Sequence, residues 1–480
     1  MIDIVVIETP SLGDRSYLLT DGASALVIDP QRDIDRVLDA AAARGAVITH
    51  VAETHLHNDY LSGGLALARR TGAAYHVNAE DTVGFNRVPA SDGDEFAVGE
   101  RMRVRVVATP GHTFTHLAYV LSDAATGEVA GVFTGGSLLY GTTGRPDLLG
   151  AEHARVLAAA QHDSARRLAG LLPDSTPVYP THGFGSLCAV APATVSASTI
   201  GEQKLANPAF LAGQQDFVDD LIAGLDEYPA YYAHMGPANA AGAPPASLSE
   251  PELLTGSEIA RRVAAGDWVI DLRARRRFAA GHVPGTLGFE LGDGLATYLG
   301  WLIPWTAPLT LLADEPGQIA AAQLQLARIG MEQVTGAATG DPQAWADGGR
   351  LTGYPVGDFA GLATVLGRSP VTVLDVRRRG EWAAGHIVGA THLPLHDLPG
   401  WLTGTATRPA EQPGWPGQLA GLAAGPVWVH CQAGYRAAVA ASFLHAAGYG
   451  VTAIDDDFGH AERAGLPLAA GLGSGSGAGP

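Results

Sequence analysis

The chain has 480 residues, with 49 acidic and 30 basic side chains and a formal net charge of −19. This length exceeds what one hydrophobic core usually supports, so we expect about two to four domains. The acidic balance excludes a surface-wide basic field of the kind that attracts nucleic acid or anionic lipid. Small molecules or a protein partner are therefore expected, with no nucleic acid and no membrane, and homo-oligomerisation is left open.

No apolar run is long enough to span a bilayer, and the opening MIDIVVIETPSLG lacks the basic start of a signal peptide. The chain contains only two cysteines, Cys188 and Cys431. This number argues against a disulfide framework and indicates a reducing compartment. We therefore expect a cytoplasmic protein in which each thiol acts according to its own surroundings.

The N-terminal part begins with short apolar and polar alternations, DIVVIE, SYLLT and ALVIDP, which predict strands broken by Gly and Asp. The stretch DIDRVLDAAAARG then predicts a helix over residues 33–45. This order of elements is typical of a mixed α and β domain with a strand-rich start.

Four histidines stand just beyond predicted strands in this part of the chain. His55 and His57 follow the strand-like run VITHVAE, and Asp59 lies two residues further. His112 ends the segment TPGH, and His182 lies in the segment THG. Scattered histidines are usually surface or core residues, but imidazoles at strand ends beside Gly turns can converge on one ion. We therefore predict a metal site here; His116, His153 and His162 are expected to be solvated or structural.

Residues 236–250 read GPANAAGAPPASLSE, a Pro/Gly/Ala stretch without periodicity, and predict a linker. After it the chain repeats itself. VIDLRARRRFAAGHVPGT from Val269 matches VLDVRRRGEWAAGHIVGA from Val373, and PLTLLADEPGQ from Pro308 matches PVWVHCQAGYR from Pro426 without gaps. Each copy alternates strand, polar loop, strand and Ala-rich helix, which predicts a parallel α/β sheet.

These patterns divide the chain into domains at residues 1–235, 251–355 and 356–468, joined by the linker at 236–250. The second copy carries a Pro/Gly/Trp-rich insertion at about residues 400–417. The final residues, 469–480, are rich in Gly and Ser and predict a disordered tail.

The turn that carries Cys431 lies between the predicted buried strand VWVH and the predicted helix AAVAASFLHAAG. It consists of Cys431, Gln432, Ala433, Gly434, Tyr435 and Arg436. Backbone N–H groups of such a turn and the positive end of the following helix can stabilise a thiolate. Gly434 permits the tight curl, and Arg436 can fix the turn or attract an anionic sulfur compound. The alternative is that Cys431 is a small buried hydrophobe.

With an Asp-x-Arg strand and a Gly-His-Ile loop upstream, residues 358–468 resemble the rhodanese family of sulfurtransferases, whose active loop reads C-x-x-G-x-R. The resemblance implies that Cys431 carries sulfur as a persulfide, that Arg436 closes the loop and that no cofactor is needed. Phosphatases use a related cysteine loop, and six residues favour sulfur over the larger phosphate group. Persulfide, thiosulfate, sulfite or a thiol are the expected small-molecule partners.

The first copy resembles the same fold but has Ala313 opposite Cys431, so it cannot form a persulfide. Asp314 and Glu315 would also repel an anionic donor, and we predict a structural or docking module at residues 252–355. His282 and His386 are expected to be hydrogen-bonded loop residues rather than catalysts.

Residues 1–235 resemble the metallo-β-lactamase fold, an αββα sandwich with the signature HxHxDH. The segments TPGHTFTH, GRPDL and THGFGSLC look most like persulfide dioxygenases fused to rhodanese domains. That family oxidises a persulfide, such as glutathione persulfide, to sulfite with molecular oxygen at one non-haem iron. The resemblance implies His55 and His112 as ligands. The third family ligand, the aspartate of an FTGD segment, is replaced by Gly136, and Tyr60 replaces the last signature histidine.

Both departures argue against a binuclear hydrolase site. The surviving set, His55, His57 and His112, predicts a three-histidine site for one Fe(II) or Zn, with Asp59 and His182 as replacement ligands or supporting groups. Cys188 lies in LCAVAPA without nearby positive charge, so an inert buried thiol is expected. The alternative is that Cys188 receives persulfide sulfur passing between the halves.

The expected fold is multi-domain α/β, with an N-terminal metallo-β-lactamase sandwich followed by two rhodanese-like domains with parallel sheets. The leading hypothesis is a persulfide-metabolising enzyme that combines a dioxygenase-like domain with a Cys431 sulfurtransferase. A second hypothesis treats the N-terminal domain as a metal-free scaffold, leaving Cys431 as the only active centre. A third, a zinc thioester hydrolase of the glyoxalase type, is disfavoured by the missing bridging carboxylate.

Overall fold

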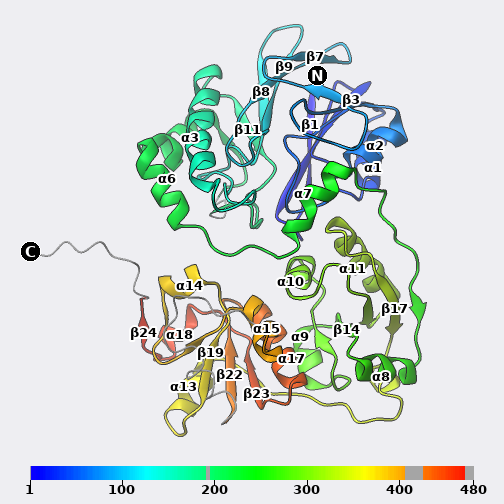
Figure 1. The fold of residues 1–480 in the computed structure, drawn as a ribbon, viewed down its shortest axis with the longest axis vertical. Coiled ribbons are helices and arrows are strands. Elements are labelled where there is room, and N and C mark those ends of the chain that lie inside the picture. The colour runs from blue at the N-terminus through cyan, green and yellow to red at the C-terminus, as the bar shows by residue number, and fades with distance from the viewer. Residues whose placement is uncertain (1, 191–194, 406–424, 471–480) are drawn as a thin grey trace, which may run out of the picture. The chain divides into compact units, whose positions relative to one another are not determined.

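The computed structural model of the chain describes residues 2–190, 195–405 and 425–470 (Figure 1). It divides into two compact units, of which the first comprises Met1–Leu248 with Leu324–Glu332 and the second Ser249–Gln323 with Gln333–Pro480. Within the described ranges, no helix combines the length and the apolar character that a membrane crossing needs. The predicted tail from residue 471 onward and residues 406–417 of the predicted insertion lie outside the described residues.

The first unit contains two six-stranded sheets. The strands of the first sheet lie in chain order: β1 (Asp3–Thr9), β2 (Asp14–Thr20), β3 (Ser24–Ile28), β4 (Val47–Ala52), β5 (Ala74–Asn78) and β6 (Val88–Ala90). The second sheet has the reverse order and contains β12 (Ser198–Thr199), β11 (Pro177–Pro180), β10 (Val129–Gly135), β9 (Leu117–Asp123), β8 (Met102–Ala108) and β7 (Glu95–Val98).

Apolar residues on the inner faces of both sheets form the central core of this unit. Tyr17 and Ile28 of the first sheet belong to the same buried cluster as Val106, Tyr119 and Phe133 of the second sheet. One further cluster joins the first sheet to α1 (Asp35–Ala42) and α2 (Gly64–Thr71). Another joins the second sheet to α3 (Ala154–Leu171), α4 (Ile200–Ala206), α5 (Pro208–Leu211) and α6 (Gln214–Ala223). The predicted αββα sandwich is confirmed.

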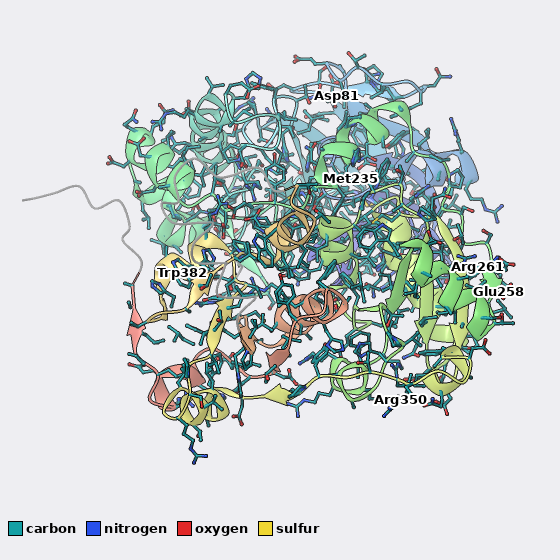
Figure 2. All side chains as sticks on the ribbon, turned by 60° about the horizontal axis from the view of Figure 1, so that its bottom comes forward. Asp81, Met235, Glu258, Arg261, Arg350 and Trp382 are labelled. Carbon is teal, nitrogen blue, oxygen red and sulfur yellow. The ribbon has the colours of Figure 1, made fainter. Side chains whose placement is uncertain are left out.

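The linker predicted from residue 236 starts too early. Helix α7 spans Tyr232–Ala241, and Met235 and Asn239 on it are buried in the first unit (Figures 1 and 2). The sequence pattern missed this helix because Pro237 and the alanines that follow lack a helical period of large apolar residues. Hydrogen bonds from Asn239 to the chain around His57 attach the helix instead.

The second unit contains two five-stranded parallel sheets of the same strand order. The first copy has β13 (Glu252–Leu253), β17 (Val334–Thr339), β16 (Leu309–Ala313), β14 (Trp268–Asp271) and β15 (Leu287–Gly288). The second copy has β18 (Val356–Gly357), β23 (Val451–Ile454), β22 (Val427–His430), β19 (Thr372–Asp375) and β21 (Thr391–His392). A separate antiparallel pair joins β20 (His386–Ile387) to β24 (Leu468–Ala469), so the predicted tail begins inside a strand.

Both copies also carry matching helices and side-chain contacts. The helices of the first copy are α8 (Gly256–Ala265), α9 (Arg275–Ala280), α10 (Leu295–Leu302), α11 (Pro316–Arg328) and α12 (Pro342–Trp345). Those of the second are α13 (Phe359–Leu366), α14 (Arg379–Ala384), the 3-10 helix η1 (Leu395–Asp397), α15 (Leu398–Thr403), α17 (Tyr435–Ala446) and α18 (His460–Arg463).

The aligned repeat is confirmed residue by residue at its histidines. His282 stacks on Phe278 at 3.9 Å between ring centroids, and His386 stacks on Trp382 at 3.7 Å (Trp382 is labelled in Figure 2). The Nδ1 of each histidine is hydrogen-bonded to the backbone carbonyl of its aromatic partner. Both histidines are therefore hydrogen-bonded, as the sequence predicts, although His386 lies in strand β20 rather than in a loop.

Candidate functional site

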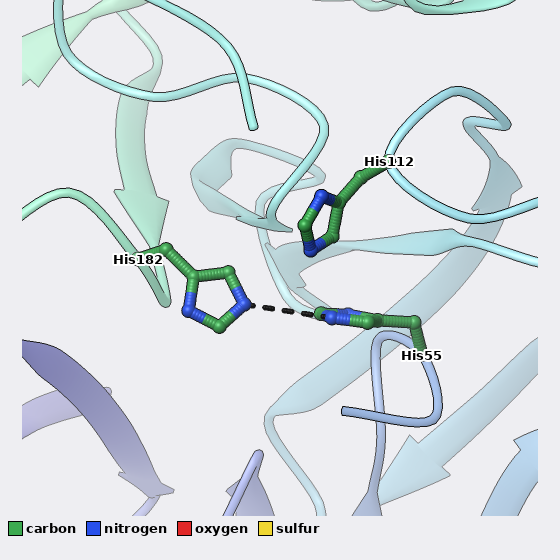
Figure 3. Close-up of side chains that lie close together, drawn as sticks. All are labelled: His55, His112 and His182. Carbon is green, nitrogen blue, oxygen red and sulfur yellow. Dashed lines mark hydrogen bonds between the residues drawn. The ribbon is translucent and has the colours of Figure 1, made fainter. Parts of the chain in front are cut away.

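Three histidines converge at one end of the sandwich in the first unit. His55 follows β4, His112 follows β8 and His182 follows β11, and all three are buried. One ring nitrogen of each lies within 4.8 Å of the others, and the Nε2 atoms of His55 and His182 are 3.4 Å apart (Figure 3). Two nitrogens that bind one ion tetrahedrally at about 2.0–2.1 Å are separated by about 3.4 Å, which matches the separation of the two Nε2 atoms.

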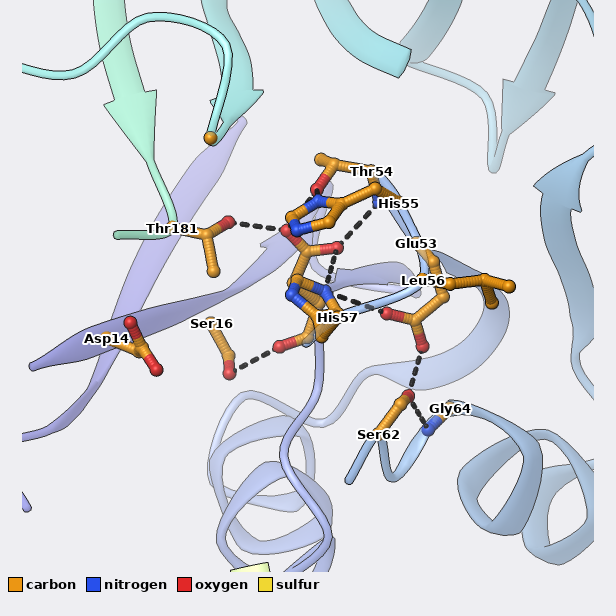
Figure 4. Close-up of polar contacts among 12 residues, drawn as sticks. Asp14, Ser16, Glu53, Thr54, His55, Leu56, His57, Ser62, Gly64 and Thr181 are labelled. Atoms are coloured by element: carbon orange, nitrogen blue, oxygen red, sulfur yellow. Dashed lines mark hydrogen bonds and ion pairs between the residues drawn. The ribbon is translucent and has the colours of Figure 1, made fainter. Parts of the chain in front are cut away.

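A hydrogen-bond chain behind His55 sets the orientation of its ring. Thr54 donates its hydroxyl proton to Asp29 at 2.8 Å, so its oxygen accepts the proton of His55 Nδ1 at 2.9 Å (Figure 4). The lone pair of His55 then lies on Nε2, which faces the other two histidines. A group behind the ligand that fixes the imidazole tautomer is a common feature of metal sites in proteins.

His112 and His182 are oriented in the same way. His112 Nδ1 donates to the carbonyl oxygen of Arg145 at 2.8 Å, and its buried Nε2 has no hydrogen-bond partner among the residues that the structure describes. His182 Nδ1 donates to Asp14 at 2.8 Å. An unpartnered, buried imidazole nitrogen that points at two others is costly unless something binds it. The three residues therefore fit one transition-metal ion of the kind that imidazole ligands prefer.

The protonation states of these groups follow from burial and from nearby carboxylates. Burial lowers the pKa of His55 and lowers that of His112 to about 3, so both rings are neutral, as metal ligands must be. Burial also opposes the charge on His182, but the carboxylates of Asp59 and Asp14 outweigh it and raise the pKa. Burial and the neighbouring Asp59 raise the pKa of Asp14 to about 7. Ion binding at His182 would release its proton.

His57 is turned toward carboxylates instead of joining this cluster. Its Nε2 lies 3.3 Å from Asp29 and from Glu53, and 2.9 Å from the hydroxyl of Tyr60 (Figure 4). Burial lowers the pKa of His57, but the two carboxylates outweigh this effect and raise it to about 9. Because these groups occupy the Nε2 of His57, whereas the Nε2 of His182 faces that of His55, the geometry favours His182 over His57 as the third ligand.

Gly136, which stands where the family has an aspartate, lies against the ring of His112 and leaves no space for a side chain. A Cβ at Gly136 would overlap the ring of His112. The backbone N–H of Gly136 donates to His116 Nε2 at 3.0 Å, and the His116 ring stacks on His55 at 4.9 Å. His116 is therefore a buried structural residue beside the metal site, and the ring of His112 leaves no room for a side chain at residue 136.

Asn239 on α7 holds the loop that carries the first two histidines. Its Nδ2 donates to the carbonyl oxygens of His57 and Tyr60, both at 2.8 Å, and its Oδ1 accepts from the N–H of Ser62 at 2.8 Å. No local pattern predicts this role, because Asn239 lies 182 positions from His57 in a stretch that resembles a linker.

Asp59 and Cys188 lie behind the histidine cluster. Asp59 is 3.3 Å from His182 Nδ1 and accepts a hydrogen bond from Ser186 at 3.3 Å. Cys188 is fully buried and burial, followed by the charge of Asp59, raises the pKa of its thiol. A neutral thiol is a poor nucleophile, which favours the inert reading of Cys188.

The sulfur turn in the second unit follows the predicted strand-turn-helix arrangement. Cys431 directly follows β22, its residue is 2% exposed, and α17 begins at Tyr435. Gly434 has a φ of 86°, a conformation that residues with a Cβ rarely adopt. The carbonyl oxygen of Gln432 accepts the N–H of Phe458 at 2.8 Å, which fastens the middle of the turn.

Arg436 is paired with a carboxylate of its own copy. Its two terminal nitrogens contact the carboxylate of Glu381 at 2.6 and 2.7 Å. Burial would raise the pKa of Glu381, but the hydrogen bonds and charge of Arg436 lower it to about 2. Of the two predicted roles of Arg436, the geometry favours fixing the turn, because its charge is already neutralised.

The first copy has no equivalent of this turn. Leu312 pairs with Asp271 as His430 pairs with Asp375, which places Ala313 at the position of Cys431. Arg277 stands at the position of Glu381 and forms an ion pair with Asp314 at 2.6 Å. The absence of a thiol at this position agrees with the predicted structural role of the first copy.

Comparisons with known proteins match the first unit and the second copy of the repeat separately. A model of the metallo-beta-lactamase superfamily matches residues 14–182, and a model of the rhodanese-like domain matches residues 360–459. A hydroxyacylglutathione hydrolase of Synechococcus sp. is 32% identical over 185 residues, which are 36% of this chain and 67% of that protein. The chain spans 50%, 62% and 67% of the first three curated relatives it matches.

Solved structures show the same likeness. A metallo-beta-lactamase from Staphylococcus aureus subsp. aureus COL is 26% identical with a TM-score of 0.63, covering 71% of this chain and 99% of that chain. ETHE1 from Myxococcus xanthus is 30% identical with a TM-score of 0.43, covering 50% of this chain and 98% of that chain. The rhodanese-like match covers the second copy. That the first copy is also rhodanese-like stays a prediction, which is supported by a strand order equal to that of the second copy. The chain belongs to the metallo-β-lactamase superfamily and carries a rhodanese-like domain C-terminal to its metallo-β-lactamase domain.

Proposed function

We propose that the chain is an enzyme of sulfane-sulfur metabolism in which Cys431 carries sulfur as a persulfide. The observation that supports this role is the turn itself, in which Cys431 ends a strand, Gly434 curls the chain and Arg436 is locked by Glu381. The Cys431 thiolate would attack the sulfane sulfur of a donor, forming the new S–S bond while the donor leaves as a thiolate or as sulfite. An acceptor thiolate, sulfite or cyanide would then take the outer sulfur and regenerate the Cys431 thiolate.

We further propose that the first unit binds one metal ion through His55, His112 and His182. The observation that supports it is that each Nδ1 is hydrogen-bonded, which leaves the three Nε2 atoms facing one another, with His182 losing its proton when the ion binds. An iron(II) ion held there would supply the redox chemistry that couples persulfide oxidation to oxygen. Asp14 would hold the ring of His182 in position for the ion, and Thr54 would hold the ring of His55.

The charges around the cluster favour an anionic substrate. Three neutral imidazoles add no negative charge to a metal ion, in contrast to a set that includes a carboxylate. The charge of His57 is offset by Asp29 and Glu53, so the expected attraction of an anion rests on the metal ion and its uncharged ligands. A persulfide anion fits these electrostatics, and its oxidation to sulfite would yield an acceptor for the sulfur on Cys431.

A hydrolase is the second candidate function. The curated relatives carry the name hydroxyacylglutathione hydrolase, and His57, Asp59 and His182 form a second set of groups that could hold an ion. Two observations weigh against a two-ion hydrolase: His182 belongs to both sets, and the ring of His112 occupies the place of a carboxylate at residue 136. A metal-free scaffold is disfavoured by the unpartnered Nε2 of His112.

Metal analysis and two activity assays test this proposal. The full chain, purified without added metal and after loading with iron(II) or zinc, is expected to bind one ion per chain and to consume oxygen with glutathione persulfide only when iron is present. Transfer from thiosulfate to cyanide is expected in the wild type and not in Cys431→Ser. Hydrolysis of a glutathione thioester by the zinc form, without oxygen uptake by the iron form, would favour the hydrolase; persistent transfer by Cys431→Ser would contradict the sulfur-carrier role.

A further inference from the structure

The turn that carries Cys431 is contacted by residues of the thiol-free copy within the second unit. Arg275 and Arg276 begin α9, and both donate hydrogen bonds to Asp455, Arg275 through Nε at 2.8 Å from Oδ1. The carboxylate of Asp455 lies directly against Gly434, where a Cβ would overlap its Oδ1. The arginines therefore hold the carboxylate that touches the most constrained residue of the sulfur turn.

The residue after Gly434 makes a second set of contacts with the same copy. The hydroxyl of Tyr435 donates to the carbonyl oxygen of Glu290 at 3.4 Å, and its ring centroid lies 5.6 Å from that of Tyr298 on α10. The carboxylate of Glu290 is itself ion-paired with Arg275. The guanidinium of Arg275 therefore contacts both Asp455, which lies against Gly434, and Glu290, whose carbonyl oxygen accepts from Tyr435.

The repeat alone does not explain these contacts, because the equivalent set of residues is not present when the two copies are exchanged. Strand register places Thr339 of the first copy at the position of Asp455 in the second. The aligned sequences place Arg379 of the second copy at the position of Arg275, where it lies 3.7 Å from Asp397 of its own copy, and Gly380 at the position of Arg276. The arginine pair therefore occurs in the copy without a thiol and its acidic partner occurs in the copy with the thiol.

We propose that Arg275 and Arg276 are positioning residues for Cys431, which give the thiol-free copy a part in sulfur transfer. They fix Asp455 against Gly434 and so keep the turn in the shape that buries Cys431. Asp455 has a side chain that is 9% exposed, so a loss of its two cationic partners leaves a nearly buried carboxylate uncompensated. The turn is then expected to open at Gly434. The inference rests on the proposed role of Cys431 as a sulfur carrier.

The test uses the full chain with Arg275→Gln and Arg276→Gln combined. We expect sulfur transfer from thiosulfate to cyanide to fall about tenfold, while alkylation of Cys431 by iodoacetamide, read from the mass of its peptide, rises at least fivefold because the thiol becomes accessible. The charge-conserving pair Arg275→Lys and Arg276→Lys is expected to restore most of both rates. Arg277→Gln, on the same helix but paired with Asp314 of its own copy, is the matched control and should change neither rate.

Two outcomes would overturn the proposal: transfer and alkylation rates unchanged in the double glutamine variant, or changes that the lysine pair does not reverse. If the double variant fails to fold, Asp455→Asn, which removes the charge and keeps the shape, is expected to shift both rates in the same directions to a smaller extent. A wild-type chain without any sulfur transfer would reject the proposed function instead, while the alkylation rates of Cys431 would still decide whether the arginines position the turn.

Discussion

Asn239→Ala tests whether α7 supports the metal site. The substitution removes three hydrogen bonds of 2.8 Å each, to the carbonyl oxygens of His57 and Tyr60 and from the N–H of Ser62. At about 1 kcal/mol per buried hydrogen bond, the first unit should lose roughly 3 kcal/mol of stability. For a unit of this size, that loss corresponds to a fall of about 6–12 °C in its thermal midpoint.

The same substitution should also weaken metal binding. Asn239 holds the loop that carries His55, and loss of an outer support of this kind typically lowers metal affinity by about 10–100-fold. Zinc titration in competition with a chromophoric chelator measures the affinity, and the thermal melt of the metal-free chain measures the stability. We expect the affinity to fall at least about tenfold.

Asn207→Ala provides the matched control. Asn207 is equally buried and its Nδ2 also donates hydrogen bonds to backbone carbonyls, those of Leu139 and Thr142, but none of its partners belongs to the loop of His55. This control should lose a similar stability and keep its metal affinity. If Asn239→Ala and Asn207→Ala lowered metal affinity equally, or if Asn239→Ala lowered neither quantity, the reasoning about α7 would be refuted.

Three further changes follow from the same geometry. Gly136→Asp, which restores the family carboxylate, is expected to lower metal content rather than raise it, because its Cβ would overlap the ring of His112; a higher iron content by elemental analysis would contradict this. Cys431→Ser is expected to reduce sulfur transfer at least about 100-fold while leaving persulfide-dependent oxygen uptake intact, since only the thiol is removed. Glu381→Gln should destabilise the second unit at neutral pH: the pKa of Glu381 is lowered from 4.5 to about 2 by its pairing with Arg436, which corresponds to about 3 kcal/mol. Because the folded-state pKa is the lower one, this stability is present above about pH 4.5 and is lost as the pH falls toward 2, so melts of wild type and variant should converge over that range; a constant difference would argue against the ion pair.

The sulfur turn was predictable because its information is local. A strand, a six-residue turn and a helix are contiguous in the sequence, and the aligned repeat identified which copy has the thiol. The structure confirms the strand that ends before Cys431 and the helix that begins at Tyr435. The αββα sandwich was expected from the resemblance to the metallo-β-lactamase fold, whereas the alternating apolar residues alone predicted only a mixed α and β domain with a strand-rich start.

The choice among the histidines was decided by tertiary structure alone. His57 stands two residues from His55, so spacing favoured it as a ligand, but Asp29 and Glu53 draw its ring away and keep it charged. Asp14 orients His182 from 168 positions away.

The roles of Asn239 and Arg275 also could not be predicted from the sequence around them. Each acts on a loop more than 150 positions distant, as Asn239 does on the chain at His57 and Arg275 does on Asp455. A hydrogen bond depends on the distance between two atoms in space, and that distance is set by packing of whole sheets and helices rather than by any pattern near either residue. The sequence by itself located the two candidate sites on the chain, the histidines after strands and the turn of Cys431. Only the folded chain showed which side chains face one another and which hydrogen bonds orient them, because these contacts join residues that are far apart in the sequence.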